Sequence, residues 1–465
     1  MVVDALQSKP LSEVRPVKSP TASLAAHYAA IERGLRLRWS PNYGSLVVPN
    51  GNANAPVHRW FHQKEAFSSL LLTQVLADTR LKHSRGLRVL DPFAGVGTTA
   101  VSVAEAVCAG ELRSPCVYGV ESNPFLHLVA ATKLAALQHG AATFCGLARR
   151  IAAKVLDNRV EAPPVPDLST FNRDGFFDPK ELRRLLSLRE AINLEEAAGA
   201  HFLDIALARV CLGSVVEAVS SLRRDGRALR RVAKRVRTSA IQAFLHRAHE
   251  IASDLPEKGT PVRGRILLGD GRLLESIDGR FEPFDLVLFS PPYPNNIDYT
   301  EVYKLENWLL GLIKDEQAFR TQRLRTVYSH PSLLRSDPLP SQLLSNSENG
   351  RLEETVAPLI SALPSDRYTQ GRTRMLRGYL LDMYLTLSAA RSRLRPRGHL
   401  VYVVGNSIHG RPPHALVIAA DLLIAHLAEF AGFSVSHVAV ARYLRRRLAG
   451  SHYLRESAVF LRRID

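Results

Sequence analysis

Short apolar runs alternate with helical segments along much of this chain. Five of these runs predict buried strands, at residues 87–93, 116–121, 265–269, 284–290 and 399–404. Helices are predicted after three of them, at residues 98–109, 124–138 and 415–431. Residues 435–443 and 457–462 are expected to close the sheet as a hairpin-like pair. Because strands that alternate with helices build parallel sheets covered on both faces, the pattern predicts a doubly wound α/β fold.

Two long stretches interrupt this alternation. A strand–helix repeat takes about 30 residues, yet 144 residues separate Glu121 from Arg265. Roughly 100 residues are therefore surplus to the sheet, and they predict a helical insertion over residues 141–262. A second, loop-rich insertion is expected near residues 309–390, because the centre of that stretch is rich in Pro and Ser.

These interruptions divide the chain into four parts. Residues 1–55 are expected to form an N-terminal arm and loop, and residues 56–140 the first half of the sheet domain. The helical insertion at residues 141–262 separates it from the second half, at residues 263–465. A helix is also predicted over residues 58–81, because apolar residues recur there at near-helical spacing.

The composition argues against several classes of protein. Of 465 residues, 46% are hydrophobic and 23% charged, which suits an ordinary globular protein. No stretch approaches the ~20 uninterrupted apolar residues that a membrane span needs, and no apolar signal region is evident, so no membrane association is expected. The four cysteines show neither metal-ligand spacing nor a disulfide framework, so we expect no metal site and a cytoplasmic location.

The charge narrows the choice of partner. Lys and Arg number 61 against 44 Asp and Glu, a formal net charge of +17. Such an excess attracts polyanions, nucleic acid first. A composition in which Arg stands in for Lys on solvated surfaces would give the same excess, so charge alone favours nucleic acid only weakly.

The first candidate for chemistry is the segment DPFAGVGTT at residues 91–99, where a predicted strand ends and a helix begins. Gly95 and Gly97 permit a tight turn and close backbone approach, and the exposed helix N-terminus suits a polar ligand. No Gly-Lys-Ser/Thr follows, so this is not a Walker phosphate loop. Glu121 ends the next strand, 30 residues after Asp91, where a carboxylate accepts hydrogen bonds from ribose hydroxyls.

The second candidate is SPPY, residues 290–293, directly after a predicted strand. Two prolines cannot continue a sheet ladder, so the chain leaves the strand in a rigid extended turn. There Tyr293 would stack on a flat heteroaromatic base, while Ser290 and the Pro291 carbonyl accept hydrogen bonds from an exocyclic amine. Holding the amine hydrogens out of the ring plane localises the nitrogen lone pair for attack on a methyl cation equivalent.

DPFAGVGTT followed by SPPY resembles the DNA amino-methyltransferases, which use S-adenosyl-L-methionine. The resemblance covers residues 57–137 and 262–465, and it implies a Rossmann-like methyltransferase sheet with a cofactor-binding half and a catalytic half. It implies that the cofactor is bound by Asp91, Phe93, Gly95, Gly97, Thr98, Glu121 and Asp270, with Phe67 and Ser68 beside its methionine end. The implied catalytic segment is Ser290, Pro291, Pro292 and Tyr293.

The first residue of the catalytic segment bears on the target base. In the family that the sequence resembles, Ser at this position mostly accompanies methylation of N4 of cytosine, and Asp or Asn methylation of N6 of adenine. The resemblance therefore implies site-specific N4-cytosine methylation of double-stranded DNA, by direct transfer to a flipped base. N6-adenine methylation, an RNA base as target and a DNA-binding subunit without turnover stay open. The sequence also leaves open whether a cognate restriction endonuclease exists, which DNA sequence is recognised and what the oligomeric state is.

Basic residues gather in the helical insertion, whose placement resembles that of a target-recognition module. On a helix over residues 223–237, cations would fall mainly along one side, as Arg223, Arg227, Arg230, Arg231 and Lys234. Such a stripe would track DNA phosphates. A solvated basic helix is the competing interpretation, and the sequence does not separate the two.

Overall fold

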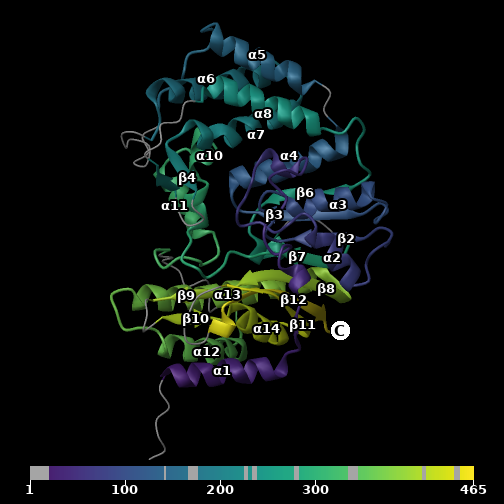
Figure 1. Cartoon of the computed structure of the whole chain (residues 1–465), viewed down its shortest axis with the longest axis vertical. Coiled ribbons are helices and arrows are strands. Elements are labelled where there is room, and N and C mark those ends of the chain that lie inside the picture. Colours follow the sequence, from purple (N-terminus) through teal and green to yellow (C-terminus); the bar gives the residue numbers. More distant parts are fainter. Residues whose placement is uncertain are drawn as a thin grey trace, which may run out of the picture.

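The computed structural model describes residues 20–140, 143–165, 176–224, 229–232, 238–276, 282–333, 344–410, 415–444 and 451–465. Within them, eight strands form one sheet in the order β6-β3-β2-β7-β8-β12-β11-β1 (Figure 1). Their bounds are β1 Leu37–Trp39, β2 Arg88–Asp91, β3 Cys116–Glu121, β6 Arg263–Leu268, β7 Phe284–Phe289, β8 Leu394–Gly405, β11 Phe433–Tyr443 and β12 Arg455–Arg463. All run parallel except β12, which is antiparallel to β8 and β11. The predicted doubly wound fold and its closing antiparallel pair are confirmed.

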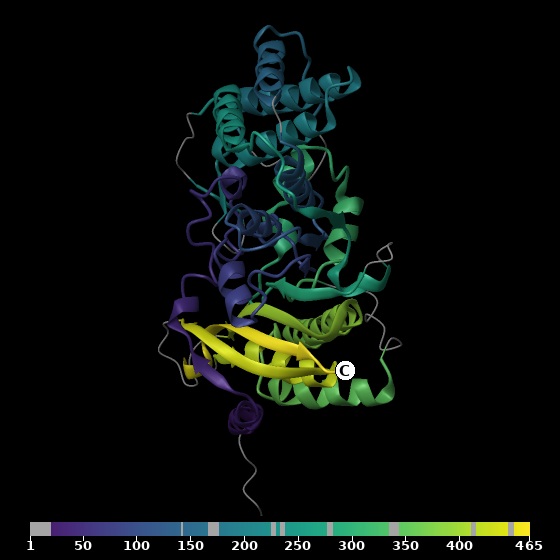
Figure 2. The ribbon, with the colours of Figure 1, turned by 90° about the vertical axis from the view of Figure 1, so that its right-hand side faces the viewer.

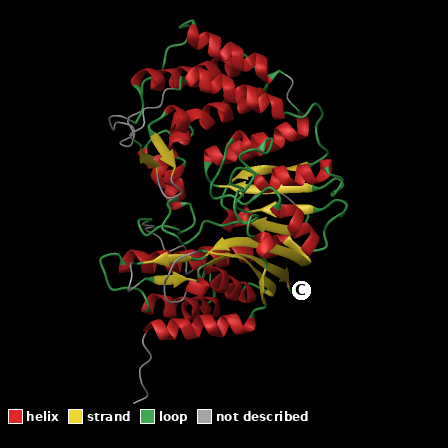
Figure 3. Cartoon of the chain, in the orientation of Figure 1, coloured by secondary structure: helices red, strands yellow, loops and turns green. Residues whose placement is uncertain are grey.

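Helices cover both faces of this sheet (Figure 3). One face packs against α2 (Leu71–Asp78), α3 (Thr98–Cys108) and α4 (Pro124–His139). The other packs against α1 (Pro20–Gly34), α12 (Asn346–Ser361), α13 (Thr369–Arg393) and α14 (Ala420–Phe430). Successive strand residues point to opposite faces, so Leu288 joins the first core and Phe289 the second. This two-sided burial explains why the strands are almost continuously apolar.

The segment between β3 and β6 is helical, as its Leu-rich and Arg-rich sequence suggests. It holds α5 (Phe144–Leu156), α6 (Pro179–Ala197), α7 (Phe202–Val219) and α8 (Ala240–Asp254), which stand above α4 in Figure 1. Helix α7 approaches α4 so closely that a Cβ atom at Gly213 would overlap the ring of Phe125. The bundle and the sheet domain therefore share one continuous hydrophobic core.

The helix predicted over residues 58–81 is wrong for most of its length. Only α2 and a single 3-10 turn at His58–Trp60 are helical there. The side chain of Asn52 donates to the carbonyl of Phe67 and accepts from the amide of Ser69, at 2.8 and 2.9 Å. These bonds satisfy backbone groups that a helix would otherwise pair internally, so the segment stays a loop.

The prediction of a loop-rich insertion at residues 309–390 is also wrong for most of the described residues in that stretch. That stretch contains α11 (Glu316–Leu324), α12 and most of α13, whereas its residues 334–343 lie outside the described ranges. Helix α12 begins at a capping box in which Ser345 and Glu348 bond each other's backbone amides. The capping signal and the buried stripe behind it were masked by the surrounding Pro, Ser and Arg residues.

The remaining short elements lie near the carboxyl ends of the strands or in side hairpins. They are α9 (Tyr299–Val302), α10 (Lys304–Leu309), the pair β9 (Ser407–His409) and β10 (Leu416–Ile418), and the pair β4 (Leu222–Arg224) and β5 (Leu229–Arg231). Figure 2, turned by 90°, shows β1 beside the yellow strands β11 and β12 at one margin of the sheet.

The tight α7–α4 contact predicts opposite effects for two glycine substitutions. Gly213→Ala should destabilise the protein by about 1–3 kcal/mol, because the new methyl group must displace the Phe125 ring in a packed core. Gly146→Ala, at an exposed position of α5, meets only a side-chain atom of Arg150 at 3.7 Å and should be neutral or stabilising by up to about 1 kcal/mol. Urea unfolding of both variants checks this, and equal effects would contradict the packing described.

Candidate active site

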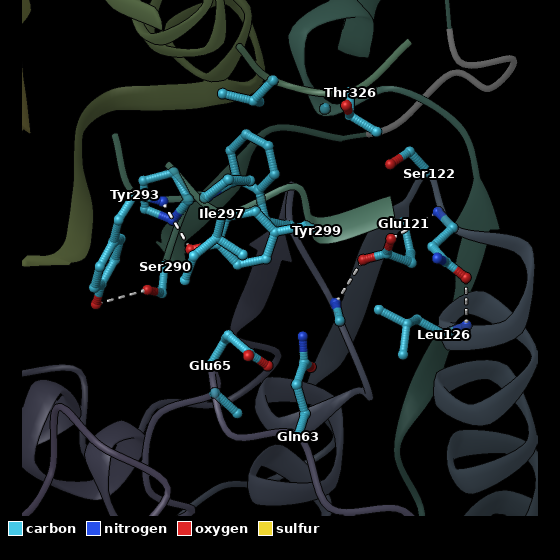
Figure 4. Close-up of a pocket in the computed structure, with 18 of the residues that line it drawn as sticks. Gln63, Glu65, Glu121, Ser122, Leu126, Ser290, Tyr293, Ile297, Tyr299 and Thr326 are labelled. Carbon is cyan, nitrogen blue, oxygen red and sulfur yellow. Dashed lines mark hydrogen bonds between the residues drawn. The ribbon is translucent and has the colours of Figure 1, made fainter. Parts of the chain in front are cut away.

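One cavity of about 290 Å³ opens at the carboxyl ends of the central strands. The chain order reverses between β2 and β7, because the strands after β2 are added on one side and β7 begins the other. Open α/β sheets bind ligands at such a switch point, since the connections leave the two strands in opposite directions. The cavity is lined from both sides of this point, by Phe93, Gly95 and Glu121 on one and Ser290, Pro292 and Tyr293 on the other (Figure 4).

The glycine turn after β2 forms one wall of the cavity. Phe93 and Gly95 line it, and the Gly95 amide donates to a Glu121 carboxylate oxygen at 2.8 Å. Gly95 has φ +52°, a left-handed conformation that favours glycine. The turn is therefore shaped so that backbone and carboxylate, rather than bulky side chains, face the cavity.

Three residues predicted to line the cofactor lie behind this wall instead. Asp91 is buried and accepts from the Phe93 amide at 3.0 Å and from the Thr99 hydroxyl at 2.5 Å. Thr98 is buried as the first residue of α3. At Gly97, with φ +82°, a Cβ would lie 3.0 Å from Ala130 of α4. These residues hold the turn against its two helices, and their predicted direct role at the cofactor is not supported.

Glu121 is a partly buried carboxylate of the site. Its two oxygens accept from the amides of Gly95 and Asn123, at 2.8 and 2.7 Å. Burial raises the pKa of Glu121 to about 7, although these amide donors oppose the shift. A carboxylate that is buried yet lines the cavity needs further donors, and ligand hydroxyls would supply them.

Asp270 also lines the cavity, at the end of β6. Its carboxylate is held by Arg272, with 2.6 Å between Oδ2 and Nη2. Arg272 reaches on to Asp382 of α13 at 2.7 Å and to the Arg325 carbonyl at 2.7 Å. This buried arginine was not predicted from the sequence, and it fixes Asp270 relative to the opposite face of the sheet.

Phe67 and Ser68 do not line the cavity. Both are buried, and the Ser68 hydroxyl donates to the Asn50 carbonyl at 3.0 Å. The chain just before them, residues 63–66, forms the wall instead, and Figure 4 shows Gln63 and Glu65 directed into it. The prediction named Phe67 and Ser68 instead of residues 63–66 because it assumed a helix through this loop.

The segment Ser290 to Tyr293 lies at the end of β7, as predicted from its prolines. The Ser290 hydroxyl is 3.1 Å from the Val403 carbonyl and 3.3 Å from the Tyr293 hydroxyl. The Tyr293 amide donates to the hydroxyl of Tyr299 at 3.2 Å, which ties the turn to the start of α9. Pro291 and Pro292 also line the cavity, so the whole segment faces it.

Two residues far along the chain complete this wall of the cavity. The Tyr293 hydroxyl donates to Glu456 of β12 at 3.1 Å, and Glu456 is bound in turn by Arg442 of β11 at 2.7 Å. A Cβ at Gly405 would lie 2.8 Å from the Tyr293 ring, so the ring packs against the β8 backbone. Burial and the neighbouring Glu456 carboxylate raise the pKa of Tyr293, which therefore stays a protonated donor.

The basic segment of the insertion is not the predicted helix. Residues 222–224 and 229–231 pair as the antiparallel strands β4 and β5, with Arg223 opposite Arg230. The dipeptide Asp225-Gly226 between them is typical of hairpin turns, a signal that the helical interpretation overlooked. Arg223, Arg230 and Arg231 are exposed, whereas Arg227 and Lys234 lie outside the described residues.

Arg224 of this hairpin faces inward. It pairs with Glu217 of α7 at 2.6 Å and with Glu306 of α10, and its guanidinium lies 5.2 Å from the ring centroids of Phe61 and Tyr303. Part of the basic cluster therefore anchors the insertion to the sheet domain rather than contacting a partner.

The chain has relatives among known proteins, at 25% identity. No protein-family profile matches the chain. The chain is 25% identical over 422 residues to the type II methyltransferase M.AvaI of Nostoc sp., covering 85% of this chain and 83% of that protein, and equally to M.AvaI of Anabaena variabilis. It is 25% identical over 311 residues to the type II methyltransferase M.BsoBI of Geobacillus stearothermophilus, covering 60% of this chain and 57% of that protein.

Solved structures give weaker matches. They include TrmN from Thermus thermophilus, with a TM-score of 0.25, 12% identity and coverage of 86% of this chain and 49% of that chain. They also include the rRNA methyltransferase aviRa from Streptomyces viridochromogenes, with a TM-score of 0.29, 11% identity and coverage of 88% and 91%. These TM-scores are too low to support an inference.

The fold and the cavity define a Rossmann-like α/β protein with a ligand site at its switch point. Its similarity to type II methyltransferases along most of its length supports the classification of the chain as a methyltransferase. None of the described helices is both long and apolar enough to cross a membrane.

The buried state of Glu121 predicts a pH dependence of stability. Its pKa is about 7 in the folded chain against an ordinary value of 4.5, so the folded state binds more protons between these values. Ligand-free protein should therefore lose stability as pH rises from about 4.5 to about 7. Glu121→Gln should remove this component. Thermal melts of both proteins across this window check it, and parallel curves would show that the carboxyl ionises normally.

The contact between Tyr293 and Glu456 predicts a positioning effect. Glu456→Ala should lower the kcat for methyl transfer roughly tenfold or more, because a misplaced catalytic ring is costly, while cofactor affinity stays near wild type. Glu456→Gln keeps an acceptor for the Tyr293 hydroxyl and should recover much of the loss. Single-turnover rates and cofactor titrations separate these effects. If kcat falls equally in both variants, the ion pair of Glu456 with Arg442, rather than its hydrogen bond to Tyr293, is what methyl transfer requires.

Proposed function

We propose that this chain is a DNA methyltransferase that uses S-adenosyl-L-methionine to methylate N4 of cytosine. The observation that carries the proposal is the single cavity that joins the Gly95–Glu121 wall to the segment Ser290–Tyr293. Type II methyltransferases act on DNA, and the similarity to M.AvaI supports DNA as the substrate here as well.

The chain's own residues fit this cofactor. The Glu121 carboxylate lines the cavity and holds one amide donor on each oxygen, and its remaining acceptor capacity suits a pair of ribose hydroxyls. Asn123 also lines the cavity, and its Nδ2 is a buried donor without a hydrogen-bond partner among the described residues. Burial of an unpaired donor is costly, so this atom is suited to an acceptor on the ligand. When bound, S-adenosyl-L-methionine supplies an electrophilic methyl group.

The catalytic segment accounts for the activation of an amine. Pro292 has no amide hydrogen next to the Pro291 carbonyl. The Pro291 carbonyl and the Ser290 hydroxyl can each accept one of the two hydrogens of an exocyclic amine. Tyr293, fixed by Glu456 and Gly405, offers its ring face to the base. These contacts hold the amine hydrogens and expose the nitrogen lone pair, and the N–H proton is released to water.

Ser290 favours cytosine over adenine, because in the amino-methyltransferases that the sequence resembles Ser at this position mostly accompanies N4-cytosine methylation. N6-adenine methylation remains the main alternative.

A base inside a duplex cannot reach this cavity, so the substrate base must be flipped out of the stack. The exposed Arg223, Arg230 and Arg231 of the β4–β5 hairpin would contact phosphates of the surrounding duplex, and a restriction endonuclease of matching specificity is the expected companion.

Nucleoside analysis tests this proposal directly. Cells expressing the wild type should contain N4-methylcytosine in DNA, and cells expressing Ser290→Ala or Tyr293→Ala should not, while both variants retain cofactor binding. Mass spectrometry of digested DNA and RNA, with calorimetric cofactor titration, measures both quantities. N6-methyladenine would overturn the choice of base, and a mark confined to RNA would overturn DNA as substrate. Cofactor binding without any mark would favour a subunit without turnover.

A further inference from the structure

Two large aromatic side chains form an exposed stacked pair at the margin of the sheet. Trp39 ends β1 and Tyr443 ends β11, the neighbouring parallel strand. Their ring centroids are 5.4 Å apart with 18° between the planes. Trp39 is 58% exposed and Tyr443 52% exposed, so much of both rings faces water. Large rings in water are costly, and because the two rings stack on each other, an outer face of the pair stays open to a planar ligand.

This aromatic pair lies at the same edge of the sheet as the candidate active site. Strands β1, β11 and β7 run in the same direction, so Trp39, Tyr443 and Ser290 all follow or end strands at the carboxyl edge. Arg442, adjacent to Tyr443 in sequence, lines the cavity and binds Glu456. The chain that leaves Trp39 also reaches the cavity wall at Val47. The pair therefore lies at the same edge of the sheet as Tyr293, and Tyr443 directly follows a residue that lines the cavity.

The surroundings of the pair are positively charged. Arg36 and Arg38 come shortly before Trp39 in the chain, and both are exposed. An exposed aromatic face with cations in the adjoining chain matches a nucleotide, whose base stacks and whose phosphate is anionic.

We propose that Trp39 and Tyr443 form a stacking platform for an unpaired nucleobase of the DNA substrate, next to the base held in the cavity. Base flipping breaks a pair and unstacks its neighbours, and a surface that stacks one exposed base offsets part of that cost. The platform is not specific for sequence, because every base has an aromatic face. This inference rests on the proposed function, since it takes DNA as the substrate.

Tryptophan fluorescence tests the platform with little interference. The other two tryptophans, Trp60 and Trp308, are 0% and 2% exposed, so quenching by an added polymer reports on Trp39. A short single-stranded oligodeoxynucleotide should quench the emission of the full-length protein. An abasic oligonucleotide of equal length and charge should not, because it offers phosphates without bases. Equal quenching by both would overturn stacking in favour of phosphate contacts alone.

Two variants and one control complete the test. Trp39→Leu and Tyr443→Leu should each weaken binding of the base-containing oligonucleotide roughly tenfold, the scale of one lost base–aromatic contact. They should leave binding of the abasic probe unchanged, as measured by anisotropy of labelled DNA. Phe202→Ala removes an equally exposed aromatic ring from the distant start of α7 and should change neither affinity.

The outcomes separate this inference from the proposed function. If DNA is methylated yet Trp39 is not quenched and both leucine variants bind normally, the platform is wrong and the proposed function stands. If neither oligonucleotide binds and no methyl mark appears in DNA, the proposed function itself fails. If Trp39 in the free protein is already shielded from acrylamide, the rings are covered by the chain and the platform is overturned.

Discussion

The reversal of strand order between β2 and β7 is the constraint on which the site depends. Both strands end at one edge, and their connections diverge there, so the sheet leaves a crevice that side chains of neither connection fill. The sequence at the two strand ends suits this position. Glycine at 95 turns the chain away while keeping its backbone close, and two prolines at 291 and 292 end β7 without a further ladder bond.

Much of the fold was predictable because burial on both faces leaves long apolar runs in sequence. The strands β2, β3, β7 and β8 and the closing pair β11 and β12 could all be placed this way. The errors fell where a local pattern was overruled by contacts from elsewhere. Asn52 holds the loop before α2 through bonds that no periodicity reveals, and β4 pairs with β5 despite the helical spacing of the arginines there.

The site was predictable where a motif carries its own backbone geometry, and not where a partner comes from a distant strand. Ser290 to Tyr293, Gly95 and Glu121 line the cavity because turns and strand ends placed them there. Glu456 could not be found in this way, because it acts on Tyr293, which only the folded sheet brings close. The contact of Arg272 with Asp382 and the place of Gln63 in the wall likewise depend on the folded chain. The acidic residue just before the apolar run of β12, Glu456, is a local signal that was present.

The direction of β12 has a consequence for how the protein is made. Among the described strands of the sheet only this one is antiparallel, and so its first residues, rather than its last, reach the edge where the cavity lies. Glu456 lies 163 residues beyond Tyr293 in the chain. A nascent polypeptide therefore exposes its complete SPPY segment long before the residue that fixes the tyrosine ring has been synthesised. Productive geometry at the cavity is thus delayed until late in translation, when most of the sheet is already available for folding.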